Sequence, residues 1–283
     1  MVLGAGLGSR LKPFTAKRPK PLMPVMGVPC IEFALLSLKS AGVTDVTINT
    51  HAHAEQMRTY FKSKPVSDLN LHESNEENLL LGSGGGFRHA LNTFDNSAFF
   101  SMNADVIHFA SLSALERKHA QLKNEHNVAI TLVLANGKAL IGQQGEYREI
   151  LTDPVSGLII GFGEKKKNVP FYTGTAIFES EAFSHLSDNE VHEFVAEVLE
   201  PMIDEGRVGY IESDALWIDI GSPELWAEAQ RRLKLALDQG DLPVEVASRL
   251  KRADPTLGGT FSSTRNKIRL EGIEYEIKDL RHP

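Results

Sequence analysis

Apolar residues recur along the chain in two alternating patterns, one with helical spacing and one typical of buried strands. Residues 31–41 carry apolar side chains at helical spacing and end before Gly42, whereas residues 43–50 have the pattern of a strand. The alternation continues with expected helices at residues 54–61, 85–94 and 111–125 and expected strands at residues 68–73, 98–102 and 128–135. This order predicts a mostly parallel sheet with helices on both faces.

The rest of the chain follows a less regular pattern. Two strand-like segments, residues 147–151 and 158–162, flank the turn residues Asp153, Pro154 and Gly157, which predicts a hairpin. Further strands are expected at residues 173–178 and 215–220, and further helices at residues 190–205 and 223–237. Because no repeat or long linker interrupts residues 1–239, we expect them to form one domain. Residues 240–283 form a C-terminal extension of unknown role, with a hairpin expected at residues 267–277.

The composition is ordinary for a soluble globular enzyme, and the length is compatible with one α/β domain. The chain has 283 residues, of which 42% are hydrophobic and 24% charged. The 37 acidic residues outnumber the 30 Lys and Arg residues, and the net charge of −7 argues against a general nucleic-acid or membrane-surface binder. No membrane-spanning run or signal-peptide layout is present, so we expect a cytoplasmic protein. Cys30, the only cysteine, excludes an internal disulfide or a thiolate zinc site and is expected to be a small buried residue near a helix start.

The opening of the chain combines glycine with positive charge. Residues 1–24 contain no acidic residue and five basic ones: Arg10, Lys12, Lys17, Arg18 and Lys20. Glycines that follow a short strand let backbone N–H groups approach a phosphate, and Arg10 and Lys20 can supply charge. The loop is not a Walker motif, because no Gly-Lys-Ser/Thr follows. It is not a dinucleotide fingerprint either, because Ser9 replaces the third glycine and the second strand ends without an acid.

The pattern Gly4-x-Gly6-x-Gly8-x-Arg10-Leu11-x-Pro13-x-Thr15-x-x-x-Pro19-Lys20-Pro21-Leu22-x-Pro24 resembles the signature loop of the sugar-1-phosphate nucleotidylyltransferases. These enzymes join a nucleoside triphosphate to a sugar 1-phosphate and release pyrophosphate. The resemblance implies a Rossmann-like three-layer α/β sandwich of the nucleotide-diphospho-sugar transferase type, with a mostly parallel mixed sheet and a small mixed sheet over the sugar side.

The resemblance also assigns roles within this loop. It implies that Arg10 and Lys20 hold the triphosphate and stabilise the departing pyrophosphate. It places the following residues against the nucleotide: Leu3, Gly4, Ala5, Gly6, Gly8 and Ser9. Gly4 stands where relatives usually have alanine, a change that adds backbone freedom.

Two aspartates resemble the family's magnesium ligands. Asp105 follows a buried strand, and Asp219 lies in the segment Trp217-Ile218-Asp219-Ile220-Gly221. Mg²⁺ prefers oxygen ligands and usually binds through one or two carboxylates plus substrate phosphates. Either aspartate alone would more often cap a helix, but the two in matching contexts predict a Mg²⁺ site. His51 and His53 lack a third ligand nearby and make a poor zinc site.

Three further segments resemble the nucleotide and sugar subsites. The base-contacting loop of the family resembles Gly82, Ser83, Gly84 and Gly85, for which a flexible helix-entry loop is the alternative. The Glu-Lys pair that binds the sugar hydroxyls and the sugar phosphate resembles Glu164 and Lys165, although Lys166 replaces the usual proline, so Lys166 and Lys167 are alternatives to Lys165. The sugar-side strands resemble the segments that contain Asn103, Thr173 and Gly174.

Together these segments predict an enzyme without a protein nucleophile. An oxygen of the sugar 1-phosphate would attack the α-phosphorus of the triphosphate, with charge neutralised by Mg²⁺, Arg10, Lys20 and Lys165. No general base is needed, because the attacking phosphate is already ionised.

The substrates are harder to assign. The chain resembles most the N-acetylmuramic acid 1-phosphate uridylyltransferases, which use UTP, and next the mannose-1-phosphate guanylyltransferases, which use GTP. A regulatory paralogue that binds nucleotide sugars without catalysis is an alternative. An NAD-dependent enzyme is a poorer one, because a ribose-binding acid is absent. We expect a monomer or homodimer.

Overall fold

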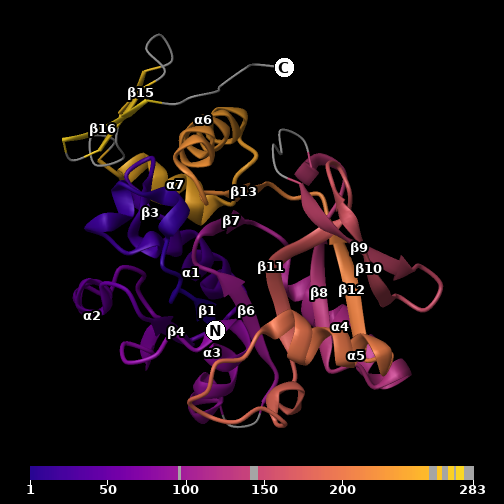
Figure 1. The fold of residues 1–283 in the computed structure, drawn as a ribbon. Coiled ribbons are helices and arrows are strands. Elements are labelled where there is room, and N and C mark those ends of the chain that lie inside the picture. The colour runs from indigo at the N-terminus through magenta and orange to yellow at the C-terminus, as the bar shows by residue number, and fades with distance from the viewer. Residues whose placement is uncertain (95–96, 141–145, 255–259, 263–266, 271, 277–283) are drawn as a thin grey trace.

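The computed structural model describes residues 1–94, 97–140, 146–254, 260–262, 267–270 and 272–276. In these residues, nine strands form one sheet in the order β5-β4-β1-β6-β11-β8-β12-β10-β9 (Figure 1). The strands are β1 (Val2–Leu3), β4 (Asp45–Thr50), β5 (Asn70–Asn75), β6 (Phe99–Asn103), β8 (Ile130–Ala135), β9 (Tyr147–Asp153), β10 (Leu158–Lys166), β11 (Phe171–Phe178) and β12 (Val208–Ser213). Only β10 and β11 run against the direction of the other seven, so the predicted mostly parallel mixed sheet is confirmed.

The parallel half of the sheet brings four strand ends to one edge. Val2 of β1 pairs with Ile48 of β4 on one side and with Met102 of β6 on the other. The register continues into β5, where Asn75 pairs with Thr50. The carboxyl ends of β5, β4, β1 and β6 therefore lie side by side, at the edge where ligands of such sheets bind.

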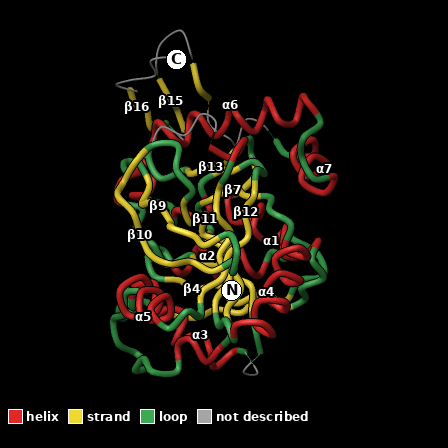
Figure 2. Tube along the Cα trace, turned by 90° about the vertical axis from the view of Figure 1, so that its right-hand side faces the viewer, coloured by secondary structure: helices red, strands yellow, loops and turns green. Residues whose placement is uncertain are grey.

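Helices cover both faces of the sheet, as Figure 2 shows for α1 and α4 on one side of the strands and α5 on the other. The helices are α1 (Cys30–Ser40), α2 (Ala54–Lys62), α3 (Gly82–Ala90), α4 (Leu112–His126), α5 (Glu200–Asp204), α6 (Pro223–Gln239) and α7 (Val244–Arg252). One core contains Phe33 and Trp226, and a second contains Phe87. Val133 of β8 belongs to the first core and its neighbour Leu132 to the second, because successive strand residues point to opposite faces. The three-layer arrangement is confirmed.

Most predicted elements are present with shifted ends. Cys30 is buried and begins α1, as expected. The hairpin of residues 147–151 and 158–162 is confirmed, but β9 and β10 extend the main sheet instead of forming a separate small sheet. The helix expected at residues 190–205 is wrong in its first part: a loop leads to a π-helix (Val195–Leu199) and then α5. Pro201 cannot donate the N–H that a regular helix needs there, which accounts for the irregular turn.

Two short strands outside the main sheet position the two predicted metal ligands: one begins directly after Asp105, and the other ends at Asp219. They are β7 (Val106–His108) and β13 (Trp217–Asp219), which pair antiparallel. None of the described helices is both long and apolar enough to cross a membrane.

The C-terminal extension packs onto the rest of the chain. Val246 and Leu250 of α7 lie in the same core as Trp226. Three short strands, β14 (Thr260–Ser262), β15 (Lys267–Leu270) and β16 (Ile273–Glu276), form a small sheet. The hairpin expected at residues 267–277 is confirmed for β15 and β16, whereas residues 271 and 277 lie outside the described residues. The Tyr275 ring lies 6.1 Å from the ring of Phe14.

Candidate active site

Residues 4–24, the signature loop, leave β1 at the carboxyl edge of the sheet and fold into three short 3₁₀ turns. Gly8 has a φ of 61°, and the hydroxyl of Thr15 donates a hydrogen bond of 2.7 Å to its carbonyl oxygen. A Cβ at Gly8 would lie 3.0 Å from the Thr15 side chain, so glycine is needed there for conformation and space. By contrast, a Cβ at Gly6 would meet nothing within 4 Å. The backbone at Gly6 is therefore accessible to a ligand.

Four of the charged residues predicted for the site, Arg10, Lys20, Asp105 and Asp219, lie together in the structure. The Lys20 ammonium forms an ion pair with Asp105, and the Lys20 side chain is only 8% exposed. Asp219 lies across the β13–β7 pair from Val106, the residue after Asp105. A Cβ at Gly221 would lie 2.9 Å from both carboxylate oxygens of Asp219 and 3.1 Å from a guanidinium nitrogen of Arg10. Two cations of the signature loop and two carboxylates from two other segments thus share one small region.

The two carboxylates fit a divalent cation. Burial raises the pKa of Asp219, the Asp105 charge raises it further, and the Lys20 and Arg10 charges lower it. The aspartates are therefore close enough to repel each other, a repulsion that a bound cation would relieve. In the described residues, no group of three or more His, Cys, Asp or Glu side chains could hold a metal. A metal here would take two carboxylates from the protein and its other ligands from substrate or water, which is the usual ligand set of Mg²⁺.

Residues 82–86, the glycine run, form the first turn of α3, and their amides differ in availability. The N–H groups of Gly84 and Gly85 donate to the carbonyl oxygen of His192, at 2.9 and 3.2 Å. A Cβ at Gly82 would lie 2.6 Å from the same oxygen. Close contact with the His192 segment thus requires glycine in this turn. In the described part of the chain, the N–H groups of Gly82 and Ser83 donate to no protein acceptor, so of the four predicted base contacts these two can donate to a ligand.

Two residues that sequence reasoning did not select connect the signature loop with the glycine run. The Gly4 N–H donates to Asn49 Oδ1 at 2.6 Å, and Asn49 Nδ2 donates to Glu76 Oε1 at 2.7 Å. The Leu81 N–H donates to Glu76 Oε2 at 3.0 Å. Burial raises the pKa of Glu76, and the bonds from Leu81 and Asn49 lower it. Their only signal in the sequence is their position at or just after the ends of two adjacent strands.

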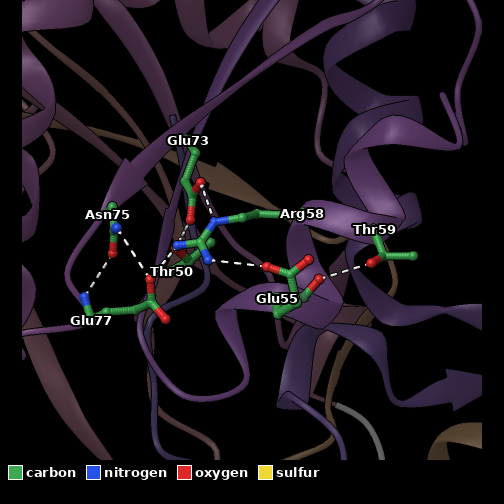
Figure 3. Close-up of polar contacts among 7 residues, drawn as sticks. All are labelled: Thr50, Glu55, Arg58, Thr59, Glu73, Asn75 and Glu77. Atoms are coloured by element: carbon green, nitrogen blue, oxygen red, sulfur yellow. Dashed lines mark hydrogen bonds and ion pairs between the residues drawn. The ribbon is translucent and has the colours of Figure 1, made fainter.

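A surface network supports this region from outside, as Figure 3 shows. Arg58 of α2 forms ion pairs with three carboxylates, those of Glu55, Glu73 and Glu77. The Thr50 hydroxyl also donates to Glu73, at 2.6 Å. The network ties α2 and the end of β4 to the segment that leaves β5 toward the glycine run.

The predicted sugar side lies on β6 and β11. Gly174 has a φ of 82°, and a Cβ there would lie 2.5 Å from the amide nitrogen of Asn103. The structure thus brings these two predicted residues into contact. Thr173 is buried, donates its hydroxyl hydrogen bond to Val133 O at 2.8 Å, and accepts from the indole N–H of Trp217 at its carbonyl oxygen. The Thr173 side chain is therefore engaged in the sheet.

The lysines of β10 point to opposite faces of the hairpin. Lys165 pairs with Arg148, which bonds to Glu200 of α5 on the side away from the aspartates. Lys166 pairs with Tyr147 on the other face. Burial raises the pKa of Tyr147 to about 12, and the charge of Asp219 raises it as well, which places that face toward the aspartates.

Glu164 belongs with Lys166 in this arrangement. Its side chain is 85% exposed, and its carboxylate lies 3.6 Å from the Lys166 ammonium. The strand geometry therefore favours Lys166 over Lys165 for a phosphate contact, and the assignment to Lys165 stays a prediction.

Comparison with known proteins agrees with this geometry. Residues 1–234 match the family model described as nucleotidyl transferase. A UTP–glucose-1-phosphate uridylyltransferase from Synechocystis is 25% identical over 97% of this chain and 72% of that protein. An N-acetylmuramate alpha-1-phosphate uridylyltransferase from Caulobacter vibrioides is 27% identical over 82% of this chain and 96% of that protein. The crystal structure of HddC from Yersinia pseudotuberculosis complexed with GMP-PN has the same fold: its TM-score is 0.67 at 20% identity, covering 82% of this chain and 97% of that one.

Proposed function

The chain belongs to the nucleotidyl transferase family, and from this premise we propose that it joins a nucleoside triphosphate to a sugar 1-phosphate with release of pyrophosphate. The observation that carries the proposal is the gathering of Arg10, Lys20, Asp105 and Asp219 beside the glycine-rich signature loop. Such a cluster suits phosphoryl-type transfer, which relies on positioning and charge neutralisation more than on covalent chemistry.

Each charged group has a distinct role in the proposed reaction. Lys20 and Arg10 bind the triphosphate and neutralise the charge that develops on departing pyrophosphate. Lys20 must exchange its ion pair with Asp105 for a phosphate contact when the nucleotide binds. Asp105 and Asp219 would hold Mg²⁺, which supplies further neutralisation of phosphate charge. No protein nucleophile takes part, because the phosphate of the second substrate attacks directly.

The remaining predicted residues define two subsites. The backbone of residues 3–9 and the amides of Gly82 and Ser83 bind the nucleotide, since these amides can donate to a ligand. Asn103 and Gly174 lie at the sugar, with Glu164 and a lysine of β10 toward its hydroxyls and phosphate. This division puts the nucleotide over β1, β4 and β5 and the sugar over β6 and β11.

We infer UTP and N-acetylmuramic acid 1-phosphate as the substrates. The Caulobacter relative, named for this activity, is matched over 96% of its own length. GTP with mannose 1-phosphate is the alternative. Pyrophosphate release from UTP and from GTP should be measured in the presence of Mg²⁺ and of each sugar 1-phosphate in turn, with glucose 1-phosphate as a third acceptor. Release that requires UTP and N-acetylmuramic acid 1-phosphate supports the inference, whereas release with another pair reassigns the substrates. Nucleotide binding without release from any pair would favour the regulatory paralogue.

A further inference from the structure

We propose that Asn49 and Glu76 form a positioning relay that holds the signature loop and the glycine run in one fixed relation, so that both contact the same bound nucleotide. The identity of the ligand, a nucleoside triphosphate, rests on the proposed function. The relay itself is a property of the protein alone. Asn49 and Glu76 are only 3% and 2% exposed, so they act through the two loops and not by touching a substrate.

The relay is a chain of three buried hydrogen bonds with a fixed order of donors and acceptors. Gly4 N–H donates to Asn49, Asn49 donates to one oxygen of Glu76, and Leu81 N–H donates to the other, at 2.6, 2.7 and 3.0 Å. Two backbone amides at the ends can only donate, so the middle must contain one amide that accepts and donates and one carboxylate that accepts twice. A buried donor that faces another donor lacks an acceptor and raises the free energy of the folded state, so this order is strongly preferred.

Two glycines, Gly86 beside the central bond and Gly4 at one end, make room for the relay. A Cβ at Gly86 would lie 2.8 Å from Asn49 Nδ2 and 2.9 Å from Glu76 Oε1. A Cβ at Gly4 would lie 2.9 Å from the carbonyl oxygen of Asn49. Contacts this short force the neighbour to move, so each glycine lets its loop approach the relay directly.

The backbone of Glu76 is also held in place, so a displacement of one loop must be passed through its side chain to the other loop. Its N–H donates to the carbonyl oxygen of Thr50 at 2.8 Å, and its own carbonyl oxygen contacts the His51 ring at 2.8 Å. On the outer side, Arg58 holds the neighbouring Glu77 and the preceding Glu73 (Figure 3). Glu76 therefore cannot shift without disturbing the end of β4. A displacement of the Leu81 backbone thus alters the hydrogen bond at Gly4.

A reversal of the relay's polarity provides the test. In Glu76→Gln, the NH2 group of the new side chain faces the NH2 group of Asn49. Rotating the new amide puts its NH2 group against the Leu81 N–H instead, and rotating Asn49 puts its NH2 group against the Gly4 N–H. In Asn49→Asp, two carboxylates face each other. The double variant N49D/E76Q restores every bond, because the carboxylate now accepts from Gly4 and from the Gln amide, whose oxygen accepts from Leu81. It also keeps the same net charge, so rescue by the double variant would separate the relay from simple loss of side chains.

The first readout is amide hydrogen exchange at Gly4 and Leu81, measured by NMR on the full chain. We expect Glu76→Gln to accelerate exchange at both amides by about tenfold or more, and the double variant to restore protection at both. Thr47→Val is the matched control: it removes a partly buried hydrogen bond to Thr93 on the same face of β4, two residues before Asn49. This control should leave both amides protected.

The second readout separates the two substrates. Glu76→Gln should raise KM for the nucleoside triphosphate by about ten- to a hundredfold, because a buried polar mismatch weakens the arrangement that binds it. KM for the sugar 1-phosphate should change by less than about threefold, because that subsite lies over β6 and β11. The double variant should recover most of the nucleotide KM.

Two results would overturn the relay. One is faster exchange at Leu81 alone in Glu76→Gln, with Gly4 unchanged, since the loops would then be independent. The other is a double variant whose exchange rates and nucleotide KM change by as much as the two single variants combined. If calorimetry shows that the unaltered protein binds neither UTP nor GTP while the exchange pattern holds, the proposed function fails and the coupling of the two loops stands.

Discussion

Arg249→Met is predicted to destabilise the protein by detaching α7 from α1. Arg249 donates two hydrogen bonds to the Glu32 carboxylate, at 2.7 and 3.3 Å. The Glu32 side chain is 3% exposed and that of Arg249 is 27% exposed. Methionine keeps much of the packing of the arginine stem but leaves a buried carboxylate without its cation. Breaking such a pair typically costs about 3–5 kcal/mol, and the partial exposure of Arg249 puts our expectation near about 3 kcal/mol.

The assay is urea unfolding together with the melting temperature. For a chain of this size, about 3 kcal/mol corresponds to a fall in Tm of roughly 6–12 °C. Lys234→Met is the matched control, because it breaks an ion pair with Asp238 on α6 in which both side chains are more than half exposed. The control should change stability by at most about 1 kcal/mol. Glu32→Gln combined with Arg249→Met should recover part of the loss, since no buried charge then lacks a partner.

The destabilisation caused by Arg249→Met should change with pH in one direction. Burial raises the pKa of Glu32 above 4.5, and Arg249 lowers it, so removing Arg249 raises it further. A carboxyl with a raised pKa in the folded state favours folding when protonated, and this contribution is lost as pH rises through the folded pKa. The cost of Arg249→Met should thus be smallest below pH 4.5 and should grow toward neutral pH. A cost equal to that of Lys234→Met, or one without this pH dependence, would refute the reasoning.

The remaining predictions concern the site. Asp105→Asn should reduce turnover at least about a hundredfold with an unchanged circular dichroism spectrum, because it removes a predicted metal ligand; undiminished turnover would contradict that role. Lys166→Met should lower kcat/KM for the sugar 1-phosphate about tenfold or more and Lys165→Met less than about threefold, and the reverse order would restore Lys165 to the role. Gly174→Ala should raise KM for the sugar 1-phosphate, because its Cβ would displace Asn103; an unchanged KM would remove both residues from the sugar subsite.

Much of the fold follows from local pattern. The helix expected at residues 31–41 is found one residue earlier, as α1, because its apolar spacing and Gly42 mark both ends. β12 is not predicted, because its six residues include Gly209 and show no clear alternation of apolar and polar side chains. α7 is not predicted either, although its two buried residues, Val246 and Leu250, stand four apart at helical spacing.

The site was predictable where it depends on residue type and not where it depends on register. The charges of Lys20 and Asp105 stand out in their motifs, and the structure pairs them. The link between Asn49 and Glu76 depends on how β4 and β5 align, which a single sequence does not determine. The two faces of β10 could not be assigned either, because an irregularity between residues 162 and 165 changes which lysine faces the aspartates.

The measurement that tests the central claim most directly follows the α-phosphate. UTP or GTP labelled at this phosphate should be incubated with Mg²⁺ and each sugar 1-phosphate, and the products should be separated and pyrophosphate quantified. The account predicts that the label moves into a nucleotide sugar in a one-to-one ratio with pyrophosphate, and only when both substrates are present. Label recovered as nucleoside monophosphate, with pyrophosphate released without a sugar 1-phosphate, would show a hydrolase and contradict the proposed transfer.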